Sequence, residues 1–302
     1  MSQNTLTIAA STGALVPAPG QGLRPEEMTD AVIEEGLQSL VIAGFSAVEL
    51  SDIWLDSRTM PLSLAEKLAR MVADSGLSII GLSTLGLKDA NHALDIAQEL
   101  GAQTFCIGLH KPPSAGRENV SFWANPPAIA PAADADFEAL AASLQTLCKR
   151  AGNAGIRVVM EMNENAIIDR SAHVLRLLDM VDAGNLGVNP DLGNLTRVTV
   201  PMIETWYETL NALAPHTEYW HVKNNLRMEH PDGFIVTHPS AMDDGVIDYR
   251  VALQTLLACG FSGPIVVESY WGDRIGGLER SRIYLEKLTN QISQIRRASG
   301  GQ

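Results

Sequence analysis

One rhythm repeats along the whole chain and limits what it can fold into. A short run rich in β-branched and other apolar residues ends in a polar residue, and a longer amphipathic stretch follows. Strict alternation of strand and helix signals predicts a parallel sheet with helical crossovers, and eight such units predict a closed (β/α)8 barrel, or TIM barrel. The eight predicted strands span residues 5–11, 46–51, 78–84, 104–109, 157–163, 186–191, 219–224 and 264–270.

The amphipathic stretches between these runs carry the start and stop signals of helices. The first begins with Pro25 and two acidic residues, which suit the first turn of a helix. The next two close on Gly76 and Gly101, and glycine is a common helix stop. We expect helices at residues 25–44, 62–76, 89–101, 134–155, 171–181, 202–214, 248–260 and 276–297.

One barrel accounts for nearly all of the 302 residues, from about residue 5 to about residue 297. We therefore expect a single domain with a disordered tail at 298–302. A doubly wound sheet is the main alternative. It usually shows a glycine-rich GxGxxG turn after its first strand, and the segment STGALVPAPGQG does not match that pattern.

Charge and composition exclude several kinds of partner. The formal net charge is -13 at pH 7, so nucleic acid and an anionic membrane surface would be repelled on average. No apolar run reaches the roughly 18 residues of a membrane span. The three cysteines are sparse, and the N-terminal MSQNTLTIAAS lacks the features of a secretory signal. We therefore expect reduced thiols and a cytoplasmic protein.

Four polar residues close successive apolar runs in the same phase: Glu161, Asp191, His221 and Glu268. Because side chains alternate along a strand, each shares the inward face of its run and lies at the end where barrels carry their chemistry. Three carboxylates and a histidine suit a hard or borderline divalent cation such as Mn²⁺, Co²⁺, Mg²⁺ or Zn²⁺. The pattern therefore predicts a metal site.

Four further residues are candidates for contacts with substrate, each with a plainer alternative. Lys223 shares a face with His221 and could bind substrate oxygen or form a structural ion pair. Glu49 closes the second strand and could bind substrate or pair with a cation, and His110 follows the fourth strand. Trp271 follows the eighth, where it could stack on a sugar or pack in the core. The long connections at 110–133 and 225–247 also follow strands, so both are expected to cover the site.

Five motifs stand out along the chain: AVEL (47–50), VVMEMN (158–163), VNPDLGN (188–194), YWHVKN (219–224) and GVIDYRVALQTLLACGFSGPIVVES (245–269). They resemble motifs of the xylose isomerase-like barrel superfamily, in its sugar phosphate isomerase/epimerase branch. The resemblance implies that the four in-phase residues bind one divalent metal, often Mn²⁺. It also implies that Glu161 and Glu268 move the proton. Arg227 stands where ketose 3-epimerases carry a substrate-binding arginine.

The chain departs from those epimerases at two positions. They usually carry a histidine where this chain has Asn194, which we keep as a substrate-binding candidate, and a glutamate where it has Ile167. Lys223 is more reminiscent of dehydratases and other lyases of the same fold.

The predicted function is a metal-dependent isomerase or epimerase of a sugar or keto-sugar. A proton would leave the carbon next to a metal-bound carbonyl or hydroxyl to give an enediolate. Glu161, Glu268 and Lys223 are the predicted catalytic residues. The alternative is a lyase or dehydratase that eliminates from a keto-inositol, keto-acid or 3-keto-glycoside, with Lys223 or His110 assisting the leaving group. A three-zinc nuclease and a non-enzymatic sugar-binding barrel are weaker rivals, and a homo-oligomer is possible.

Overall fold

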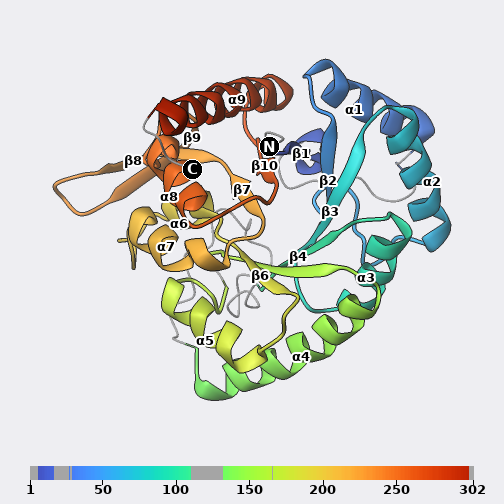
Figure 1. Cartoon of the computed structure of the whole chain (residues 1–302), viewed down its shortest axis with the longest axis horizontal. Coiled ribbons are helices and arrows are strands. Elements are labelled where there is room, and N and C mark those ends of the chain that lie inside the picture. The colour runs from blue at the N-terminus through green and yellow to red at the C-terminus, as the bar shows by residue number, and fades with distance from the viewer. Residues whose placement is uncertain (1–5, 17–26, 28, 110–131, 165, 299–302) are drawn as a thin grey trace.

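Eight parallel strands form the centre of the protein, as expected (Figure 1). The computed structural model describes residues 6–16, 27, 29–109, 132–164 and 166–298. The strands of the barrel are β1 (Ile8–Ser11), β2 (Ala47–Ser51), β3 (Ser78–Thr84), β4 (Thr104–Gly108), β5 (Arg157–Glu161), β6 (Leu186–Asn189), β7 (Trp220–Val222) and β10 (Ile265–Val267). Their order in the sheet is β6-β5-β4-β3-β2-β1-β10-β7. A parallel bridge from Val188 to Thr217 links β6 to the segment before β7, so the barrel is nearly closed.

Helices surround this barrel in the order that the sequence predicts (Figure 1). They are α1 (Asp30–Ile42), α2 (Leu62–Asp74), α3 (Ala90–Glu99), α4 (Asp134–Asn153), α5 (Ser171–Val181), α7 (Trp206–Leu213), α8 (Tyr249–Ala258) and α9 (Arg274–Ala298). The prediction that the first helix starts at Pro25 is wrong in its boundary. The Thr29 side chain accepts a hydrogen bond from Val32 N as an N-cap, so α1 begins at Asp30.

A short helix and a two-stranded hairpin were not predicted. A short helix, α6 (Leu192–Thr196), follows β6 directly. The connection predicted at 225–247 contains an antiparallel hairpin of β8 (Asn224–Glu229) and β9 (Ile235–Ser240), which projects from the barrel in Figure 1. The other long connection, 110–133, lies outside the described residues except for its last two positions. Ala298 ends α9, and the rest of the predicted tail lies outside the described residues.

The interior of the barrel is layered, and this layering places the site. One buried layer is apolar and consists of Ala9, Ala47, Cys106, Val159, Tyr219 and Val266. Two residues further along their strands, on the same inward face, stand Glu49, Glu161, His221 and Glu268. The apolar layer therefore fills the barrel below a polar layer at the carboxyl ends of the strands.

The structure also bears on the predictions about the cysteines and about membrane-spanning segments. All three cysteines are free thiols, with Cys106 and Cys148 buried and Cys259 exposed. Among the described residues, no helix has both the length and the apolar character needed to cross a membrane.

Candidate metal and catalytic site

The structure brings the four predicted metal ligands together. Glu161 ends β5, Asp191 lies just after β6, His221 is the middle residue of β7, and Glu268 directly follows β10. All four are buried, and one ligand atom from each lies within 4.8 Å of those of the other three. Four separate strand ends therefore meet at one point of the barrel mouth.

Asp191 and Glu161 are linked through Asn194, a predicted substrate-binding residue. Asp191 is the N-cap of α6, and its Oδ1 accepts a hydrogen bond of 3.1 Å from Asn194 N. The Asn194 side-chain amide donates to Glu161 Oε1 and to the carbonyl of Met162, both at 3.1 Å. Asn194 is 2% exposed, so its observed contacts orient the carboxylates, and contact with substrate stays a prediction.

Lys223 was predicted either to bind substrate oxygen or to form a structural ion pair, and the structure shows ion pairs. Its Nζ contacts Asp191 Oδ2 and Glu268 Oε2, two of the four predicted ligands. The backbone around it is fixed by Tyr249, whose hydroxyl accepts from Lys223 N at 3.1 Å and donates to Lys223 O at 2.6 Å. An ammonium group is therefore part of the site. Its contact with substrate stays a prediction.

Glu49 lies at the site, but its observed partner is a protein side chain. Its Oε2 is 2.7 Å from His221 Nε2, and both residues are fully buried. The Tyr219 hydroxyl lies next to Glu49 without reaching hydrogen-bond geometry. Burial raises the pKa of Glu49, and the charge and hydrogen bond of His221 oppose that rise. Substrate binding by Glu49 stays a prediction.

Tyr270 is a site residue that the sequence reasoning did not single out. Its hydroxyl donates a hydrogen bond of 2.6 Å to Glu268 Oε1. Burial and the neighbouring Glu268 raise the pKa of this hydroxyl well above its ordinary value, so it remains a donor. The alternation of side chains along the strand could have indicated it, because Tyr270 lies two residues after Glu268 and therefore on the same face.

Burial and charge set the pKa values of the carboxyl groups around Lys223. Burial raises the pKa of Asp191 to about 7, although Lys223 acts to lower it. Burial also acts to raise the pKa of Glu268, but Lys223 and His221 outweigh it, and this pKa lies below its ordinary value. Glu268 is therefore a carboxylate at neutral pH, which is the form that accepts a proton.

The chemistry of the donor set fits a divalent cation. Besides the four predicted ligands, the cluster contains the carboxylate of Glu49 and the ammonium of Lys223. Among these six described side chains, four carboxyl groups face one ammonium and at most one imidazolium. A bound cation favours the ionised form of such buried carboxyl groups. The ion would be held by Glu161, Asp191, His221 and Glu268.

For three further residues, Arg227, Trp271 and His110, substrate binding stays a prediction. Arg227 lies in β8 and donates to the carbonyls of Val198 and Val200, the latter at 2.8 Å. Trp271 follows β10 and is 46% exposed. His110 lies outside the described residues.

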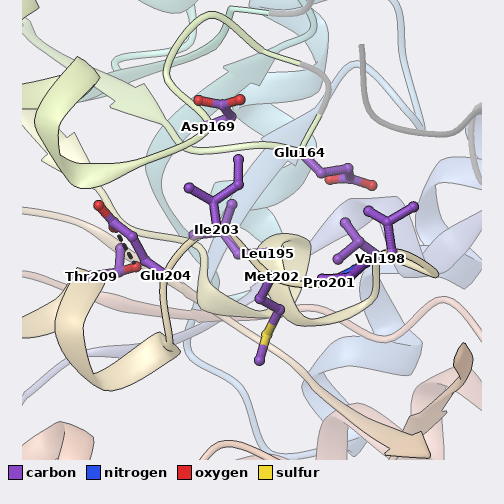
Figure 2. Close-up of a pocket in the computed structure, with 10 residues that line it drawn as sticks. Glu164, Asp169, Leu195, Val198, Pro201, Met202, Ile203, Glu204 and Thr209 are labelled. Atoms are coloured by element: carbon purple, nitrogen blue, oxygen red, sulfur yellow. Dashed lines mark hydrogen bonds between the residues drawn. The ribbon is translucent and has the colours of Figure 1, made fainter. Parts of the chain in front are cut away.

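A pocket lies between the segments that follow β5 and β6 (Figure 2). Its empty volume is about 420 Å³. It is lined by Glu164, Asp169, Leu195, Val198, Val200, Pro201, Met202, Ile203, Glu204 and Thr209. Glu164 is already paired with Arg197, at 2.6 Å and 3.0 Å. No predicted metal ligand is among the residues that line this pocket, so the chemistry is assigned to the carboxylate cluster.

Comparison with known families classifies the chain. Residues 37–289 match the model of the xylose isomerase-like TIM barrel family, and the chain belongs to that family.

Particular relatives share most of the chain length. A ketose 3-epimerase from Arthrobacter globiformis is 25% identical over 252 residues, covering 79% of this chain and 78% of the relative. A xylose isomerase-like TIM barrel protein from Mycobacterium smegmatis, solved in complex with magnesium, is 25% identical with a TM-score of 0.83, covering 96% of this chain and 99% of that one. A D-allulose 3-epimerase from Methylomonas sp. shares the fold, with a TM-score of 0.68 at 16% identity over 94% of this chain and 98% of that one.

The missing side chain at Gly193 leaves room for the side chain of Lys223, and replacing Gly193 with Ala tests this. Alanine favours a helix by about 0.5–1 kcal/mol over glycine. Here, however, a Cβ would clash with Lys223 Cγ and lie 2.9 Å from Lys223 O. We expect Gly193→Ala to destabilise the protein by about 1–3 kcal/mol in urea unfolding. Gly184→Ala is the control, since nothing lies within 4 Å of its Cβ. Equal stability of the two variants would contradict this role of Gly193.

Proposed function

We propose that this chain is a divalent-metal-dependent epimerase or isomerase of a sugar or keto-sugar, which moves a proton at the carbon next to a carbonyl. One observation carries the proposal. Glu161 Oε1 and Glu268 Oε1 lie 3.4 Å and 3.5 Å from His221 Nδ1 in a buried cluster at the barrel mouth. The similarity to a ketose 3-epimerase supports a ketose as the substrate.

The two glutamates can act from different sides of a substrate. They come from β5 and β10, which are not neighbours in the sheet. One carboxylate removes the proton to give an enediolate, and the other group, once protonated, returns a proton to the opposite face. Return to the neighbouring carbon instead gives isomerisation. Tyr270 holds the Glu268 carboxylate, and Asn194 holds that of Glu161.

A divalent ion supplies Lewis-acid stabilisation of the negative charge that develops on substrate oxygen. We propose Mn²⁺, with Mg²⁺, Co²⁺ and Zn²⁺ as alternatives that the same ligands accept. The Mycobacterium smegmatis relative was solved with magnesium, which supports a divalent ion at this kind of site. A cytoplasmic location and a homo-oligomer stay predictions.

A second candidate function is a lyase or dehydratase, and the position of Lys223 favours it. Its ammonium contacts Glu268, so a proton donor lies beside a proton acceptor. If Glu268 removes a proton from the carbon next to the carbonyl, Lys223 can protonate the oxygen that leaves the following carbon. A keto-inositol, keto-acid or 3-keto-glycoside carries such an oxygen.

Deuterium incorporation separates these functions. The Mn²⁺-loaded protein is incubated in deuterated water with ketohexoses, keto-inositols and 3-keto-glycosides, and the products are followed by NMR. We expect deuterium next to the carbonyl of one ketose, together with its epimer. An unsaturated product would instead assign the lyase. No exchange with any of the three classes would contradict both.

A further inference from the structure

We propose that Glu49 is a positioning residue that holds the His221 ring so that Nδ1, and not Nε2, faces the other three ligands. The inference rests on the proposed function, because it gives Glu49 a part in holding the same metal ion. It also replaces the predicted contact of Glu49 with substrate by a different role.

The two nitrogens of His221 face different partners. Nε2 is 2.7 Å from Glu49 Oε2. On the other side of the ring, Nδ1 is 3.4 Å from Glu161 Oε1 and 3.5 Å from Glu268 Oε1. A neutral imidazole that donates its Nε2–H to a carboxylate presents a lone pair at Nδ1. Glu49 thus selects the tautomer that can bind a cation among the carboxylates.

The surroundings restrict the histidine to this orientation. Glu49 is 0% exposed and His221 is 1% exposed, so water does not compete for Nε2. The ring of Tyr219 lies tilted against the imidazole, with 5.6 Å between centroids. The backbone is fixed as well, because His221 N donates to Asn189 Oδ1 at 2.8 Å.

The neighbouring strand β3 is irregular beside Glu49 and leaves space near this contact. The register between β2 and β3 shifts between Val48 and Glu49, and Glu49 then pairs with Gly81. A Cβ at Gly81 would lie 2.7 Å from the Tyr219 hydroxyl. The missing side chain on β3 therefore leaves room for the tyrosine that lies against His221.

A second metal ion is the rival explanation for this carboxylate. Glu49, Cys106 and His221 each offer a ligand atom, and these atoms lie within 4.8 Å of one another. Two ligand atoms on one tetrahedral zinc ion lie about 3.3–3.6 Å apart, given metal–ligand distances of about 2.0–2.2 Å. Glu49 Oε2 and His221 Nε2 are closer than that, at 2.7 Å, which is a hydrogen-bond distance.

Metal affinity tests the proposal. The purified full chain is stripped with a chelator and titrated with Mn²⁺, and free Mn²⁺ is followed by EPR. We expect one ion per chain in the wild type and an affinity about 10–100-fold weaker in Glu49→Gln. Cys106→Ser is the matched control, since Cys106 is equally buried and also lies near His221. This control should bind Mn²⁺ like the wild type.

NMR of the wild type keeps the test independent of how the variant folds. In zinc-loaded protein labelled with ¹⁵N-histidine, the His221 signals are assigned by their loss in His221→Gln. We expect a proton on Nε2 and none on Nδ1. A proton on Nδ1, unchanged affinity in Glu49→Gln, or a second ion lost in Cys106→Ser would each overturn the proposal. If the wild type binds no divalent ion, the proposed function itself fails.

Discussion

Glu268→Gln is expected to lower the rate of solvent deuterium exchange into the substrate by about 10²- to 10⁴-fold. The amide has nearly the shape of the carboxylate but cannot accept the proton. The structure supports this assignment because Lys223 and His221 keep the pKa of Glu268 below its ordinary value, while Tyr270 fixes its Oε1 at 2.6 Å. The measurement is the NMR exchange assay at saturating Mn²⁺, so that weaker metal binding is compensated.

Two controls give this result its meaning. Glu279→Gln makes the same change on the exposed surface of α9 and should leave the exchange rate unchanged. Tyr270→Phe removes the hydrogen bond to Glu268 but keeps the carboxylate, so its effect should be smaller than that of Glu268→Gln. If Glu268→Gln exchanges deuterium as fast as the wild type, Glu268 does not carry the proton.

Lys223→Met is expected to lower kcat by about 10²- to 10³-fold, which is the usual effect of removing one group that stabilises charge in a transition state. Methionine approximates the length of the lysine side chain without its charge. The ammonium contacts Asp191 and Glu268, two of the four predicted metal ligands. The measurement is kcat at saturating substrate and metal, together with the free energy of unfolding from urea titration.

The unfolding measurement separates the two roles that the sequence left open for Lys223. If kcat stays at the wild-type value and only the free energy of unfolding falls, the lysine is a structural ion-pair partner. Lys67→Met is the matched control, because Lys67 forms an exposed ion pair with Asp30. It should change neither kcat nor, beyond about 1 kcal/mol, the free energy of unfolding.

The barrel and the cluster of its four predicted ligands were predictable because both depend on local periodicity. A strand presents every second residue to one side, so Glu161 and Glu268 could be assigned to the interior from their own strands alone. Parallel strands that end at one face then bring such residues together without further information. The same reasoning led to Lys223, which follows His221 in phase, and would have led to Tyr270, which follows Glu268 in the same way.

Contacts between distant segments were not predictable in this way. The Glu49–His221 bond joins β2 to β7, two strands that are far apart in the sequence. The ion pairs of Lys223 depend on the space above Gly193. The contacts of Arg227 with the carbonyls of Val198 and Val200 depend on the hairpin that carries it, and its contact with substrate stays a prediction. Neither the hairpin nor α6 has a periodic signal strong enough to separate it from a loop.

Metal dependence of the proton transfer tests the central claim most directly. The wild-type protein is stripped with a chelator, and deuterium exchange into its ketose substrate is measured before and after Mn²⁺ is restored. We expect exchange to fall to the background of the uncatalysed reaction in the stripped protein and to return with about one equivalent of Mn²⁺, as four ligands around one ion require. Exchange that continues at the full rate in the stripped protein would contradict the account.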